Sequence, residues 1–182
     1  MKLARGLHHL RTVLTRRTIT DCIRNAQRSS FRIVHYSIQS NHLHLIIEAD
    51  DRNAMSSGMK GFGRRLVCAL NKLWQRRGPV FPKRFHDRVL RSLHQVRNAL
   101  RYVLNNHLKH GERPRSDRTG LAPDPYSSGR YFDGWRGRAP DLDPQAEGAV
   151  IALPCWKIRC GWKRHHAAIG LDELPVSAPA RG

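Results

Sequence analysis

The chain has 182 residues, enough for one domain with a substantial core followed by a tail. Its 33 Lys and Arg against 14 Asp and Glu give a formal net charge of +19, which attracts nucleic-acid phosphates but would also suit a ribosomal or membrane-surface protein. No apolar run approaches the roughly 20 residues of a membrane-spanning helix, and the start lacks the apolar stretch of a signal peptide. We therefore expect a cytoplasmic protein with no membrane partner.

The N-terminal region predicts a short strand and then a helix. Residues 3–5 are compatible with a strand remnant. The helix is expected to begin at Thr18, whose hydroxyl can cap it together with Asp21, and to run to about Ser29.

Residues 31–39 and 42–49 predict two adjacent strands joined by a tight polar turn. Because alternate side chains of a strand point to opposite faces, His42 and His44 project together. The apolar residues that alternate with them face a core: Leu43, Leu45 and Ile47. Two imidazoles on one face can chelate a divalent metal. The alternative is a pair of partly exposed histidines on a half-buried strand.

A long helix is predicted over residues 53–77, ended by Gly78 and Pro79. Its apolar stripe comprises Met55, Met59, Phe62, Leu66, Ala69, Leu70 and Leu73. A second face carries Lys60 and Arg64. That face is either a solvated surface or a track for a DNA backbone, and the sequence favours neither.

Residues 80–90 predict a further strand, which carries Lys83, Arg84 and Arg88. The resulting order, β-α-β-β-α-β followed by a helix, is that of a split-βαβ antiparallel sheet in an α+β fold.

The last predicted helix of this region begins at Ser92, which forms a capping box with Gln95, and ends at Gly111. Its apolar side comprises Leu93, Val96, Leu100, Val103, Leu104 and Leu108. Tyr102 lies roughly opposite the centre of that stripe, and Asn106 follows one turn later. Tyr102 is therefore a poor candidate for a core residue.

A phenol beside an amide oxygen, on a face that could meet a two-histidine metal site, suits nucleophilic attack on a phosphodiester. Taken alone, Tyr102 is better explained as an ordinary amphipathic surface tyrosine. Tyr126 and Tyr131 are rival nucleophiles, but they fall in predicted loops with no ligand-type residue one turn away. Tyr36 alternates along a strand and is expected to be packed.

Three segments together resemble the single-tyrosine HUH transposases, the small insertion-sequence enzymes and their REP-associated relatives. Residues 34–48 resemble the family's HUH motif. Residues 100–106 resemble its tyrosine helix, where a polar metal ligand follows the nucleophile by four residues, and residues 78–90 resemble the basic segment before that helix. The resemblance covers residues 31–111 in order and spacing.

The resemblance implies a homodimeric α+β protein with a ferredoxin-like core and an added tyrosine-bearing helix. Such a protein cuts single-stranded DNA at hairpin-marked ends, uses Mg²⁺ or Mn²⁺, and keeps a covalent 5′-phosphotyrosine intermediate. By position, Tyr102 would be the nucleophile, with His42, His44 and Asn106 as metal ligands. The basic side chains expected to contact DNA are Lys60, Arg64, Lys83, Arg84, Arg88 and Arg101.

The chain departs from the family pattern at three places. Gln39 and Ser40 stand where Met-Pro is frequent, His107 stands where Pro is frequent, and the start predicts a truncated first strand. These departures leave open a domesticated or decayed DNA-binding protein without catalysis. A replication initiator or relaxase using the same chemistry is a third hypothesis, although that class usually has larger domains.

Residues 112–182 are expected to form a basic, Pro- and Gly-rich tail to a domain at residues 1–111. Trp156 and Trp162 are interleaved with basic residues there. They could stack on bases, or they could belong to a short helix that docks onto the core.

The chain has four cysteines, and no two of them have the CxxC spacing. Cys22 and Cys68 fall in predicted helices and are expected to be reduced and buried. A zinc site is conceivable near the C-terminus, although the spacing is poor. Its ligands would be Cys155, Cys160, His165 and His166.

Overall fold

A computed structural model describes residues 1–83, 85–110, 115–117, 120–137 and 155–175. Its elements, in chain order, are α1 (Val13–Arg24), β1 (Phe31–Ile38), β2 (Leu43–Ala49), α2 (Arg52–Leu73), α3 (Leu93–Leu104), η1 (Asn106–His110), β3 (Arg115–Asp117), β4 (Gly120–Ala122), η2 (Ser128–Tyr131), α4 (Trp156–Arg159) and η3 (Gly161–Arg164). The α+β class is confirmed. No described helix is both long and apolar enough to cross a bilayer.

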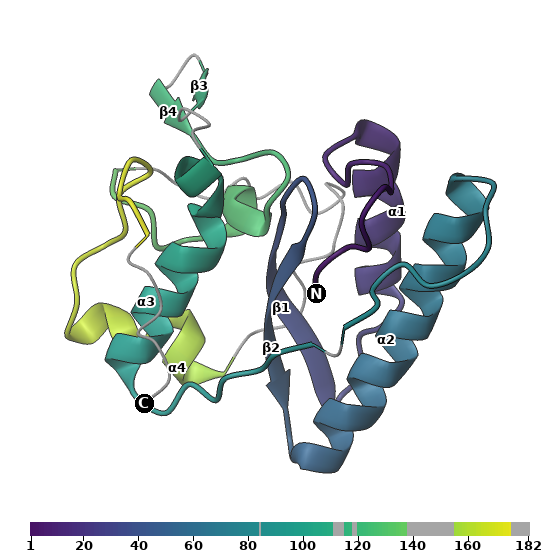
Figure 1. Cartoon of the computed structure of the whole chain (residues 1–182). Coiled ribbons are helices and arrows are strands. Elements are labelled where there is room, and N and C mark those ends of the chain that lie inside the picture. Colours follow the sequence, from purple (N-terminus) through teal and green to yellow (C-terminus); the bar gives the residue numbers. More distant parts are fainter. Residues whose placement is uncertain (84, 111–114, 118–119, 138–154, 176–182) are drawn as a thin grey trace.

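The predicted hairpin is confirmed as the antiparallel pair of β1 and β2 at the centre of the molecule (Figure 1). Ser37 pairs with His44, and the register shifts between Ile33 and His35. This shift lets His35 and Val34 contribute to the same side of the sheet. The turn closes through the Gln39 N–H, which donates to the carbonyl of His42 over 2.8 Å.

One face of the hairpin is covered by α1 and α2, which pack against each other (Figure 1). This first core is built from one face of each strand and the apolar stripes of both helices, as Ile19, Ile33, Phe62 and Leu66 illustrate. The helices approach the sheet closely at Gly58, where a Cβ would lie 2.2 Å from the ring of Phe31.

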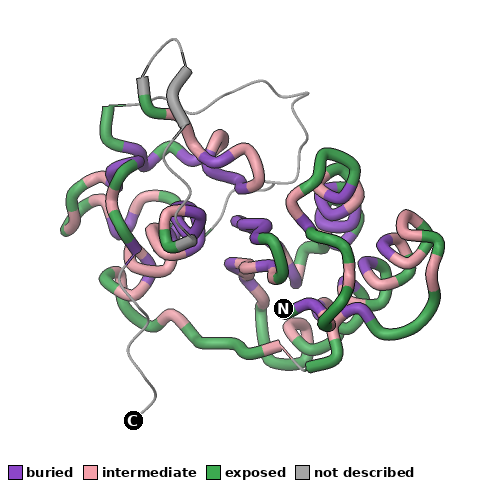
Figure 2. The backbone as a smooth tube through the Cα atoms, turned by 45° about the horizontal axis from the view of Figure 1, so that its top comes forward, coloured by how far each residue is buried: buried purple, intermediate pink, exposed green. Residues whose placement is uncertain are grey.

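The opposite face is covered by α3, α4 and described residues between Phe132 and Leu171. The second core joins Val96 and Leu100 of α3 to aromatic and aliphatic side chains far along the sequence: Phe132, Trp135, Ile158, Trp162, Ile169 and Leu171. Figure 2 shows buried stretches of the backbone turned inward on both sides of the hairpin. Trp162 is fully buried, as the docking alternative predicted, whereas Trp156 is 46 % exposed.

Both edges of the hairpin receive short additional pairings. Lys2 forms a β-bridge with His42 beside β2, and Ser127 forms one with Ser37 beside β1. The strand remnant expected at residues 3–5 is thus a single bridge at Lys2. These bridges occupy hydrogen-bonding groups at the turn end of each edge.

The first helix, α1, begins and ends earlier in the chain than the sequence predicts. It begins at Val13, because the hydroxyl of Thr12 accepts a hydrogen bond from the Thr15 N–H and caps it, and it ends at Arg24. Cys22 is buried in this helix as expected, but Cys68 on α2 is exposed, so that expectation was wrong.

The strand expected over residues 80–90 is not formed in the described part of that segment. Val80, Phe81 and Phe85 pack against the first core, but Pro82 has no N–H to donate and most of the described side chains after it are exposed. The long helix before it also ends earlier than expected, at Leu73, and Gln75 turns the chain with a φ of 51°.

Candidate active site

The two histidines of the hairpin lie side by side at the start of β2. Their ring centroids are 4.6 Å apart and their planes are nearly perpendicular. His42 Nδ1 lies 2.7 Å from Asn41 Oδ1. Because an amide oxygen only accepts, this contact places the proton on Nδ1 and the lone pair on Nε2, the form that a metal requires.

Tyr102 reaches this pair from α3. Its ring centroid lies 5.2 Å from that of His44, edge to face. Ser92 and Gln95 form the predicted capping box at the start of α3, and the apolar stripe of the helix packs on the sheet. Val96, Leu100 and Val103 are buried while Tyr102 is half-buried, so the tyrosine faces the histidines at the rim of the core.

Lys109 also contacts this ring, with its Nζ 4.6 Å from the Tyr102 centroid. A cation–π contact of this kind fixes the orientation of an otherwise half-exposed phenol. The sequence pattern did not single out Lys109, although its position two turns after Tyr102 would place both on one side of a continuous helix.

Asn106 begins η1, directly after the cap of α3, and is 1 % exposed. Its carbonyl oxygen Oδ1 is buried and makes no hydrogen bond with any described residue. A buried acceptor of this kind ordinarily has a partner, and an amide oxygen is a ligand that Mg²⁺ or Ca²⁺ accepts. The residue therefore fits the cation-binding role that the sequence assigns to it.

The described residues contain no group of three or more His, Cys, Asp or Glu side chains able to hold a metal. The set of His42, His44 and Asn106 is of a different composition, with two imidazoles and one amide. The two rings are adjacent and the Asn106 amide oxygen is buried without a hydrogen bond to any described residue, and both donor types are ones that divalent ions accept.

Comparison with protein-family models, with curated proteins and with solved structures finds no match. The site is therefore interpreted from its own geometry.

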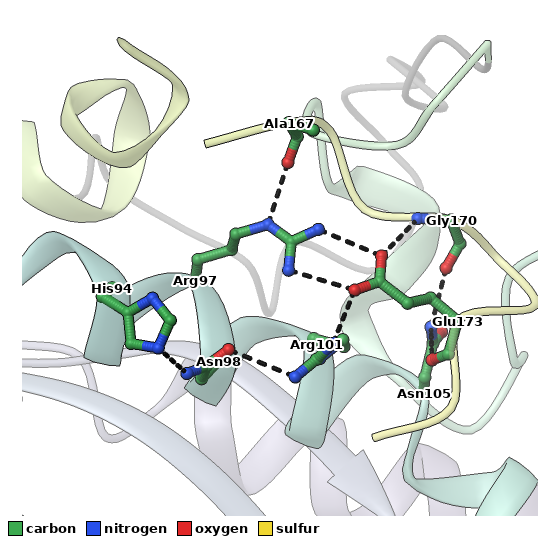
Figure 3. A network of polar contacts seen from close by, with 8 residues as sticks. All are labelled: His94, Arg97, Asn98, Arg101, Asn105, Ala167, Gly170 and Glu173. Carbon is green, nitrogen blue, oxygen red and sulfur yellow. Dashed lines mark hydrogen bonds and ion pairs between the residues drawn. The ribbon is translucent and has the colours of Figure 1, made fainter. Parts of the chain in front are cut away.

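The outer face of α3 is clasped by the chain near residue 173 (Figure 3). Arg97 donates to both Glu173 carboxylate oxygens over 3.0 and 3.1 Å, and Arg101 donates to Oε1 over 2.7 Å. The Asn105 amide donates to the carbonyls of Gly170 and Glu173 over 2.8 and 3.0 Å. Tyr102 directly follows Arg101 and Asn106 directly follows Asn105, so the clasp restrains the backbone beside both residues.

The carboxylate at the centre of the clasp has a perturbed pKa. Burial by itself raises the pKa of Glu173, but hydrogen bonds from Arg97, the Gly170 N–H and Arg101 outweigh burial and lower it. The clasp is therefore formed by an ionised carboxylate at neutral pH.

A second buried ion pair joins Arg11, before α1, to Asp124, after β4. Arg11 donates to both oxygens of Asp124 over 2.9 and 3.0 Å, and the Asp124 side chain is 1 % exposed. His107 Nδ1 lies 4.0 Å from the same carboxylate. The guanidinium also stacks over Tyr126 at 4.5 Å from its centroid. Tyr126 is thus part of a structural pair, and sequence patterns gave no signal for it because its partners are far apart in the chain.

The side chains expected to contact DNA divide into three groups. Lys60, Arg64 and Lys83 line one pocket on the α1–α2 side of the sheet. Arg88 is exposed in the segment before α3, and Arg84 lies outside the described residues. Arg101 is held by Glu173 and by the Asn98 side chain.

Proposed function

We propose that the protein is a metal-dependent single-stranded DNA endonuclease and strand transferase of the single-tyrosine HUH type. The observation that carries the proposal is the cluster of Tyr102, His44 and His42, with successive ring centroids 5.2 and 4.6 Å apart. A phenol beside a histidine pair suits nucleophilic attack on a phosphodiester, because the phenol can form a covalent intermediate and the imidazoles can hold a metal. The net charge of +19 supports a DNA substrate.

Tyr102 acts as the nucleophile. Its phenolic oxygen loses its proton and forms a bond to the scissile phosphorus, while the bond from phosphorus to the 3′ oxygen breaks and that oxygen leaves as a 3′-hydroxyl after taking up a proton. The 5′ end then remains on Tyr102 as a phosphotyrosine. Attack on this diester by a different 3′-hydroxyl restores the phenol and joins the strands, so each step exchanges one phosphodiester bond for another.

His42, His44 and Asn106 would hold the divalent ion, Mg²⁺ or Mn²⁺. When bound, the ion supplies positive charge that stabilises the transition state at phosphorus. Asn41 orients the ring of His42, and Lys109 holds the ring of Tyr102. The clasp on Glu173 fixes the helix that carries the nucleophile.

The finer architecture belongs to the same proposal. We propose that the hairpin and its flanking helices are the ferredoxin-like core of this family in reduced form, that the protein works in the cytoplasm as a homodimer, and that its substrate carries a hairpin. A decayed, non-catalytic DNA-binding protein is the alternative that the basic surface also supports.

The test is a denaturing-gel assay with labelled single-stranded hairpin DNA from the flanks of the gene and Mg²⁺ or Mn²⁺. We expect a covalent protein–DNA adduct that is lost in Tyr102→Phe and retained in the matched control Tyr131→Phe. Adduct formation by Tyr102→Phe would assign the nucleophile elsewhere. Binding without any adduct in the wild-type protein would support the non-catalytic alternative.

A further inference from the structure

An open pocket of about 410 Å³ lies across the sheet from Tyr102 and combines basic with aromatic side chains. Its walls come from α2, from the segment before α3 and from the first residue of the chain. The side chains that matter here are Met1, Lys60, Arg64, Phe81, Lys83 and Phe85. A volume of this size falls within the range of sites that bind small molecules, and it would accommodate a nucleotide.

The pocket is positively charged. None of its lining residues is acidic. Within the described part of the chain, no ion pair engages Lys60, Arg64 or Lys83. Lys60 and Arg64 lie one turn apart on α2, and a Cβ at the intervening Gly61 or Gly63 would meet nothing within 4 Å. Three cations around such an open backbone surface suit the phosphates of an extended strand.

The apolar part of the pocket is aromatic. Phe81 and Phe85 are half-buried and pack against the first core, so their rings are held in place while one side remains accessible to the pocket. Fixed aromatic rings beside cations form the usual platform for single-stranded nucleic acids, because an unpaired base has a free face to stack. A base inside a duplex has no such face, which argues for a single strand.

The pocket is joined to the histidine pair around the edge of β2. The Leu43 N–H donates to the carbonyl of Met1 over 2.8 Å, and Lys2 forms a bridge with His42. Met1 thus lines the pocket while its backbone pairs with the strand residue between the two histidines. In Figure 1 the segment between α2 and α3 runs along the same edge, from the α2 side of the sheet to the α3 side.

We propose that this pocket binds an unpaired nucleotide of single-stranded DNA, with its base stacked on Phe85 or Phe81 and its flanking phosphates on Lys60, Arg64 and Lys83. The inference rests on the proposed function for the identity of its ligand. It adds that the substrate bends around the edge of β2, so that one strand contacts both faces of the sheet.

The test measures binding of a fluorescein-labelled oligo-dT by anisotropy, without divalent metal and in a Tyr102→Phe background, so that no cleavage occurs. The double variant Lys60→Ala/Arg64→Ala is compared with Arg65→Ala/Lys72→Ala, which removes the same charge from exposed positions of α2 outside the pocket. We expect roughly tenfold weaker binding for the pocket variant, a salt slope smaller by about 1.4, and less than about twofold change for the control. Equal losses in the two variants would overturn the proposal.

Stacking is tested with Phe85→Leu, which keeps apolar volume but removes the ring. The wild-type pocket should prefer oligo-dT over the same oligomer with abasic positions by roughly tenfold, and Phe85→Leu should reduce that preference. If both Phe85→Leu and Phe81→Leu kept the full preference for oligo-dT over the abasic oligomer, no base would be bound in the pocket. Equal affinity of the wild-type protein for oligo-dT and for the dA·dT duplex would refute the proposal as well. Adduct formation by the wild-type protein is measured in a separate assay. The nuclease proposal can therefore be refuted while nucleotide binding in the pocket is supported, and nucleotide binding can be refuted while the nuclease proposal is supported.

Discussion

Because His35 is buried, we predict that the free energy of unfolding falls in mild acid. The side chain is 5 % exposed, with Nδ1 3.1 Å from Ser128 Oγ and its ring edge-on to Phe132 at 5.5 Å between centroids. Burial lowers the pKa of this imidazole from 6.5 to about 4, although Asp133 opposes the change. The folded protein therefore keeps His35 neutral at a pH at which the unfolded chain would protonate it.

The sign follows from proton uptake on unfolding. Between pH 6.5 and about 4 the unfolded chain binds one more proton at this position, so the free energy of unfolding falls as the pH falls through that window. The gap of roughly 2.5 pH units, at about 1.4 kcal/mol each, gives a loss of about 3 kcal/mol by pH 4. Above pH 7 the group contributes no pH dependence.

The assay is urea unfolding followed by circular dichroism at intervals from pH 4 to 8, for the wild-type protein and for His35→Gln. The glutamine variant is expected to be less stable at pH 7, because the packing against Phe132 is lost, but its stability should fall less steeply below pH 6.5. Subtracting the two curves isolates the contribution of His35 from that of other groups. Parallel curves would refute the assignment of a buried, neutral imidazole.

Three further substitutions test packing and the site. Glu173→Ala leaves Arg97 and Arg101 without their carboxylate and should lower the free energy of unfolding, measured by chemical denaturation, by about 2–3 kcal/mol. The control Asp172→Ala changes an exposed neighbour and should alter the free energy of unfolding little. Equal effects of the two substitutions would contradict the clasp. Gly58→Ala forces a Cβ onto a core phenyl ring and should cost about 1–3 kcal/mol, while Gly61→Ala on the same helix faces open space and should stabilise by about 0.5–1 kcal/mol. Asn106→Leu should abolish Mn²⁺ binding in calorimetry yet change stability by less than about 1 kcal/mol, since Oδ1 has no described hydrogen bond to lose.

The parts of the fold that sequence predicted were those with strong local signals. The hairpin has two strands of β-favouring residues and a polar turn, and it was found with nearly correct bounds. The capping box gave the correct start of α3, but the helix ends at Leu104 and not at Gly111, and the 3₁₀ helix η1 follows it. The start of α1 was missed because Thr12 and Thr18 are equally good caps by sequence, and only the packing of Leu10 and the following turn decides between them. The segment before α3 has strand-type residues but no partner to pair with in its described part.

The sequence predicted the central residues of the candidate site, but it did not predict the residues that hold them in place. His42, His44 and Tyr102 have spacings that place them on defined faces, and their proximity follows once α3 lies on the hairpin. The supports depend on contacts across long sequence distances. Arg11 with Asp124 and Arg101 with Glu173 are examples, and no periodic pattern relates such residues.

The clasp on Glu173 makes the order of synthesis matter. A nascent chain contains the hairpin and α3 well before it contains Trp162, which fills the second core, or Glu173, which holds α3 from outside. Until those residues leave the ribosome, α3 has only part of its packing surface, and closing such distant contacts is slow compared with forming a local helix. The Tyr102 helix therefore takes its final position only after Glu173 has left the ribosome, so a nascent chain that stops before Trp162 would carry every residue of the histidine–tyrosine cluster without the scaffold that holds it in place.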